Sequence, residues 1–80
     1  MRLPRDLTGA DLIKRLENVG YRKTRQTGSH ARLTSNDPNT NHVTVPLHDP
    51  LRIGTLAAIL GDVATAQGID REELLQKLFD

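Results

Sequence analysis

The sequence contains no cysteine and no tryptophan, and its only aromatic residues are Tyr21 and Phe79. Without cysteine, neither a disulfide nor a thiolate metal site can support the fold, which fits a reducing compartment. The core must therefore be built from Leu, Ile, Val and Ala. A chain of 80 residues is expected to form one domain, residues 1–80, with a small margin of stability.

Long apolar runs are also missing. No stretch approaches the roughly 20 residues that cross a bilayer, and the N-terminus has a positive start with no apolar segment behind it. We therefore expect a cytoplasmic protein with no signal peptide and no membrane segment.

Acidic residues are missing from one part of the chain. None lies between Glu17 and Asp37, whereas most charged residues from Asp62 onward are acidic. The acid-free segment holds four basic residues, Arg22, Lys23, Arg25 and Arg32. This asymmetry favours a polyanion partner for the middle of the chain. On charge alone, a solvated strand surface explains the same pattern.

Apolar spacing predicts a first helix from about Gly9 to Val19. Thr8 is a suitable N-cap, Asp11 completes a capping box, and Gly20 suits the left-handed position after a helix. A second helix is expected from about Gly54 to Gly68. A short C-terminal helix starts at Asp70, with Glu73 completing its capping box.

Three strands are expected between the first two helices, over residues 21–27, 29–35 and 42–45. Turns are expected at Gly28-Ser29 and over residues 36–41. Alternation places Ala31 and Leu33 on one face, and it places His30, Arg32, His42 and Thr44 on the other. For the first strand two choices stay open, because either Arg22, Thr24 and Gln26 or Lys23 and Arg25 could face the helices.

This order predicts an α+β fold. The helices at both ends of an antiparallel meander pack on its apolar face, which gives a two-layer α-β-β-β-α sandwich with an additional short C-terminal helix. The opposite face of the sheet is then left for polar residues.

Several short motifs in this order resemble the HicA family of toxins. They are Gly20-Tyr21, Arg25-Gln26, Gly28-Ser29-His30, Thr44-Val45-Pro46 with His48, Gly54-Thr55-Leu56 and Ile59-Leu60. The agreement extends from about Leu12 to Leu60. Two departures are Ala31, where the family often has a second histidine or a larger residue, and a longer segment over residues 62–67.

The resemblance implies a fold similar to double-stranded RNA-binding domains and cleavage of mRNA by one histidine, here His30. It also implies a HicB-type antitoxin that covers His30, and oligomers could form through that antitoxin. No cofactor and no metal are implied.

The chemistry of RNA makes a single histidine sufficient. The 2′-hydroxyl of RNA is the nucleophile, so the enzyme needs only to move protons and to stabilise charge on the phosphorus. Imidazole titrates near neutral pH and can serve as base or acid. We expect Arg25 and Arg32 to neutralise the scissile phosphate, and Arg22 and Lys23 to hold flanking phosphates.

Three further residues are predicted to contact RNA. Gly28 permits close approach of the backbone, Ser29 can donate a hydrogen bond, and Thr55 lies where the second helix opens with free amide groups.

Four other functions are compatible with parts of the sequence. A metal site at His42, His48 and Asp49 lacks evidence of converging ligands. A Ser29–His30 nucleophile is excluded because adjacent side chains on a strand diverge. A non-catalytic RNA-binding module of the same fold is the alternative function. A DNA-binding regulator is weaker still, because the helices show no face rich in Arg, Asn or Gln.

Overall fold

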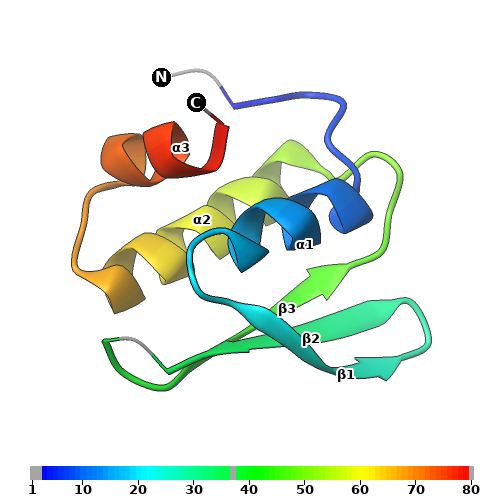
Figure 1. Ribbon diagram of the computed structural model, residues 1–80. Coiled ribbons are helices and arrows are strands. Elements are labelled where there is room, and N and C mark those ends of the chain that lie inside the picture. The colour runs from blue at the N-terminus through cyan, green and yellow to red at the C-terminus, as the bar shows by residue number, and fades with distance from the viewer. Residues whose placement is uncertain (1–2, 37, 80) are drawn as a thin grey trace.

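The computed structural model describes residues 3–36 and 38–79. Its elements are α1 (Gly9–Glu17), β1 (Arg22–Thr27), β2 (His30–Ser35), β3 (Asn41–Pro46), α2 (Ile53–Gln67) and α3 (Arg71–Phe79). The predicted α+β fold, similar to double-stranded RNA-binding domains with an added C-terminal helix, is confirmed (Figure 1). The turn expected over residues 36–41 lies between β2 and β3, and its Asp37 is outside the described residues.

The start of α1 follows the predicted capping box. Thr8 Oγ1 accepts a hydrogen bond from the Asp11 backbone N–H at 3.0 Å, and Asp11 Oδ2 accepts one from the Thr8 backbone N–H at 3.3 Å. The predicted end at Val19 is wrong by two residues, because the N–H groups of Asn18 and Val19 bond to carbonyls three residues back and so tighten the last turn. Gly20 does adopt a positive φ, of 100°.

The helices form a layer on one face of the sheet. α1 and α2 lie side by side over the strands, and α3 lies across them on the side away from the sheet (Figure 1). α2 contacts both β3 and α3, and its buried residues form one stripe along the helix: Leu56, Ile59, Leu60, Val63 and Ala64. Its predicted end is confirmed, since Gly68 follows in the left-handed conformation with φ of 68°.

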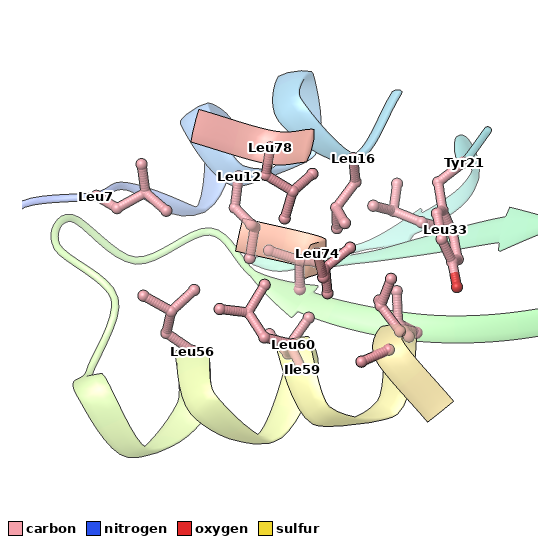
Figure 2. Close-up of a cluster of buried hydrophobic side chains, with 14 of the residues drawn as sticks. Leu7, Leu12, Leu16, Tyr21, Leu33, Leu56, Ile59, Leu60, Leu74 and Leu78 are labelled. Carbon is pink, nitrogen blue, oxygen red and sulfur yellow. The ribbon is translucent and has the colours of Figure 1, made fainter. Parts of the chain in front are cut away.

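α3 completes the hydrophobic core. Its buried residues are Leu74, Leu75 and Leu78, and Figure 2 shows Leu74 and Leu78 between α1 and α2. Arg15 of α1 holds the end of α3, because it donates a hydrogen bond to the Leu78 carbonyl at 2.9 Å and lies over the Phe79 ring. The predicted cap is present as a bond from the Glu73 N–H to Asp70 Oδ1 at 2.7 Å.

The sheet is antiparallel with the strand order β1-β2-β3. Ala31, Leu33, Val43 and Val45 are buried against the helices, whereas His30, Arg32, His42 and Thr44 are exposed on the opposite side. The face assignment made from alternation is therefore confirmed for β2 and β3. We call the side that carries His30 the open face, because no described element covers it (Figure 1).

A β-bulge resolves the choice left open for β1. Lys23 is paired with Leu33 and Arg25 with Arg32, so Thr24 is an extra residue between them. Residues three apart normally lie on opposite faces of a strand, but the bulge puts Arg22 and Arg25 together on the open face. Neither regular alternation is therefore correct over the whole strand.

No helix in the described ranges, 3–36 and 38–79, has the length and apolar character needed to cross a membrane.

Candidate functional site

A shallow depression on the open face brings several of the predicted site residues together. It has a volume of about 200 Å³ and is lined by Arg25, Thr27, His30, Arg32 and Thr44. All three strands contribute to it, because Arg25 pairs with Arg32, Thr27 with His30, and Arg32 with Thr44. The depression therefore has an imidazole, two guanidinium groups and two hydroxyl groups around one small volume.

The turn between β1 and β2 positions His30. Gly28 adopts a φ of 57°, a conformation that a side chain would strain, although a Cβ there would meet no neighbour within 4 Å. The Ser29 carbonyl accepts a hydrogen bond from the Leu47 N–H at 2.7 Å, which ties the turn to the segment after β3. His30, the first residue of β2, is thus fixed at its backbone while its side chain stays exposed.

The charges around His30 suit an anion. Arg25 and Arg32 are directly opposite each other on neighbouring strands, and both are exposed. Among the described residues, 3–36 and 38–79, no acidic side chain lines the depression. A phosphate group placed there would meet two cations that can each donate paired hydrogen bonds.

The other predicted RNA contacts lie outside the depression. Arg22 is on the open face, opposite Thr34. Lys23 is on the helix side of the edge strand, and its Nζ donates a hydrogen bond to Gln26 Oε1 at 2.8 Å. Gly28 and Ser29 form the exposed turn before His30. Thr55 lies half-buried in the first turn of α2, in the helical layer, so its contact with RNA stays a prediction without support from position.

Sequence reasoning missed two hydroxyl groups in the depression. Thr44 was assigned to the open face but not to the site, and Thr27 was not assigned at all. Thr27 pairs with His30 across the two-residue Gly28-Ser29 turn, so the turn expected at that position was enough to indicate this neighbour. Thr44 is the β3 partner of Arg32, two residues before Pro46, the partner of His30. Pairing the expected second and third strands residue by residue would therefore have indicated that Thr44 lies at the site.

The Gly20-Tyr21 motif lies away from the depression and contributes to the fold. Tyr21 is buried, and its hydroxyl accepts a hydrogen bond from Asn41 Nδ2 at 2.6 Å, which joins the start of β1 to the start of β3. Burial raises the pKa of Tyr21 above its usual value of 10.0; the Asn41 hydrogen bond opposes this, and the charge of Asp62 adds to it.

His42, His48 and Asp49 do not form a metal site in the described part of the chain. Within residues 3–36 and 38–79, no group of three histidine or acidic side chains could hold a metal ion. His42 is instead bonded through Nδ1 to Thr34 Oγ1, at 2.9 Å.

Comparison with known proteins gives one family. Residues 9–64 match the family described as the HicA toxin of bacterial toxin-antitoxin systems. The match begins at α1 and ends within α2, so α3 lies beyond it. Searches among curated proteins and among solved structures found no match.

Proposed function

The chain belongs to the HicA family, the toxins of bacterial toxin–antitoxin pairs, and we propose that it is an endoribonuclease that cleaves mRNA with His30 as its proton-transfer residue. The observation that supports this most is that His30, Arg25 and Arg32 line one exposed depression. That arrangement combines a group that moves protons near neutral pH with groups that bind a phosphate.

The proposed reaction needs little from the protein. A 2′-hydroxyl of the RNA attacks the adjacent phosphorus, its proton leaves, and the 5′-oxygen of the next nucleotide accepts a proton as its bond to phosphorus breaks. The His30 imidazole takes part in proton transfer, while Arg25 and Arg32 neutralise the extra negative charge on the phosphorane. The hydroxyls of Thr27 and Thr44 are available as further donors to phosphate oxygens.

The decisive experiment compares RNA cleavage by the wild-type protein and by His30→Ala. We expect the substitution to lower the cleavage rate by about 10²–10⁴-fold, the usual contribution of one proton-transfer group, and to abolish growth arrest in bacteria. His48→Ala is the matched control, because His48 is also an exposed histidine and does not line the depression. Circular dichroism checks that both variants fold.

The outcomes separate the two functions considered. Undiminished cleavage by His30→Ala would overturn the catalytic role of His30. Binding of RNA by the wild-type protein without any cleavage would favour the non-catalytic RNA-binding module instead.

As a toxin of this family, the protein pairs with an antitoxin. We propose that a HicB-type antitoxin covers the open face and His30 with an acidic surface, because the depression is lined by cations. Chemical modification of histidine tests this: we expect the antitoxin to protect His30 and to leave His48 reactive. Equal reactivity of His30 with and without antitoxin would exclude direct occlusion.

A further inference from the structure

A chain of hydrogen bonds crosses the open face beside the depression. Thr24 Oγ1 and Thr34 Oγ1 are 2.9 Å apart, and Thr34 Oγ1 and His42 Nδ1 are also 2.9 Å apart. Thr24 Oγ1 lies 3.4 Å from the Arg32 carbonyl. One residue from each strand takes part, and Thr34, at the centre, is only 8% exposed. The role proposed for His30 does not use this chain.

Counting protons gives the chain a direction. A carbonyl can only accept, so Thr24 donates its single hydroxyl proton to the Arg32 carbonyl. Thr34 then donates to Thr24, and the Nδ1–H of His42 donates to Thr34. A neutral imidazole with its proton on Nδ1 has an unprotonated Nε2, which is a hydrogen-bond acceptor. The His42 side chain is exposed, and its ring has no other hydrogen bond to the described residues, so Nε2 is left for a ligand.

His42 is too far along the sheet to act on the same phosphate as His30. His42 pairs with Thr34, and Thr34 lies four residues after His30 on β2. At about 3.3 Å per residue, this separates the two positions by about 13 Å along the strand. A proton-transfer group must come within about 3 Å of the proton it moves, directly or through one water. His42 therefore faces a different nucleotide of a bound strand.

We propose that Nε2 of His42 accepts a hydrogen bond from a ribose 2′-hydroxyl of the RNA, at a nucleotide displaced from the cleavage site. Phosphate oxygens only accept hydrogen bonds, so they do not pair with an unprotonated Nε2, whereas a 2′-hydroxyl can donate. Arg22 lies on the same face opposite Thr34 and supplies a cation for the neighbouring phosphate. Arg22, Thr34 and His42 form a row across the three strands, with a cation on one side of Thr34 and a hydrogen-bond acceptor on the other. A phosphate and a 2′-hydroxyl recur along an RNA backbone and match these two groups. Because DNA lacks the 2′-hydroxyl, the row lets the open face distinguish RNA from DNA.

The test measures binding rather than cleavage, although the inference rests on the proposed RNA-directed function. The His30→Ala protein is used as the parent so that the strand stays intact. Its dissociation constant is measured for a single-stranded RNA oligonucleotide and for the 2′-deoxy version of the same sequence. In that background His42→Asn keeps a side-chain donor for Thr34 but removes Nε2, and His48→Asn is the matched control.

We expect the parent to bind RNA more tightly than its 2′-deoxy version, and His42→Asn to lose about two- to tenfold of that preference, the effect of one neutral hydrogen bond. His48→Asn should retain the full preference. In a second series, one ribose of the RNA oligonucleotide at a time is replaced by 2′-deoxyribose. At one position this replacement should weaken binding to the parent but not to His42→Asn, which is the coupling expected for a direct contact.

Two results would overturn the proposal. One is an equal loss of affinity for RNA and its 2′-deoxy version in His42→Asn, which would indicate a contact with a base or a phosphate. The other is an unchanged RNA preference. Failure of the proposed ribonuclease function appears separately, as absence of cleavage by the wild-type protein, and it leaves this binding comparison intact.

Thr34→Val provides a second measurement within the same proposal. It removes the acceptor that orients the His42 ring but leaves Nε2 in place. We expect a smaller loss of RNA preference than in His42→Asn. A full preference in Thr34→Val would contradict orientation of the ring by the hydroxyl chain.

Discussion

The two faces of the sheet are made by alternate residues of the same strands, yet they have opposite characters. On the helix side of β2, Ala31 and Leu33 are fully buried, whereas their neighbours His30 and Arg32 are exposed on the open face. Stability and chemistry are therefore interleaved along the chain and separated in space. Substitutions one residue apart should affect different properties of the protein.

The largest expected effect is on the helix side. Leu33→Ala removes a fully buried side chain from the core and should lower the free energy of unfolding by about 2–5 kcal/mol. This is a large share of the roughly 5–15 kcal/mol that typically stabilises a domain. Urea unfolding followed by circular dichroism measures the loss. A loss below about 1 kcal/mol would show that the helix-side face does not carry the stability assigned to it.

Arg32, the neighbour of Leu33 on the open face, should affect RNA binding and have little effect on stability. Arg32→Ala should change the free energy of unfolding by no more than about 0.5 kcal/mol, as for other exposed positions. It should weaken RNA binding and lower the slope of log affinity against log salt by about 1, because one phosphate contact is lost.

Lys77→Ala is the control for Arg32→Ala, since Lys77 is an exposed cation on α3, the element farthest from the open face (Figure 1). Its RNA affinity and salt slope should equal those of the wild type. Equal effects of both substitutions would mean that binding follows net charge rather than the open face.

The smallest expected effect is the pH dependence of stability that comes from Tyr21, where β1 meets the core. Because its folded-state pKa is raised above 10.0, its contribution to stability is complete below about pH 10 and is lost as pH rises through the folded-state value. Tyr21→Phe loses the Asn41 hydrogen bond, at a cost of about 1 kcal/mol at neutral pH, but has no phenol to ionise.

The measurement for Tyr21 is direct because it is the only tyrosine. Absorbance of the tyrosinate should show a titration above pH 10 in the folded protein. Unfolding free energy measured across this range should fall more steeply in the wild type than in Tyr21→Phe. Identical slopes would contradict the effect of burial on this group.

Most of the fold could be predicted because its signals are local. The capping box at Thr8 and Asp11 depends on residues three apart, and the two faces of β2 follow from the apolar positions of Ala31 and Leu33. The order of elements, together with the motifs around His30, was enough to predict the α+β fold and the family.

The features that the sequence did not reveal depend on partners distant along the chain. β1 has no apolar residue to mark a face, so its bulge is visible only from its pairing with β2. In the sequence, Gly9 has no feature that sets it apart from another first helical residue. In the structure a Cβ there would collide with the Pro46 carbonyl, and the Gly9 N–H donates a hydrogen bond to the His48 carbonyl at 2.9 Å. The hydroxyl chain that ends at His42 likewise needs three strands in register.

The bulge at Thr24 also affects how insertions and deletions in β1 would change the open face. Every residue of β1 except Thr24 has a Cα partner on β2. Loss of one residue from a strand normally reverses the direction of all the side chains beyond it. Deletion of Thr24 would instead leave the partners of Arg22 and Arg25 unchanged, and it would remove the hydroxyl that links Thr34 to the Arg32 carbonyl. A single codon can therefore add or delete one hydroxyl of this chain without redirecting the cations on either side of it.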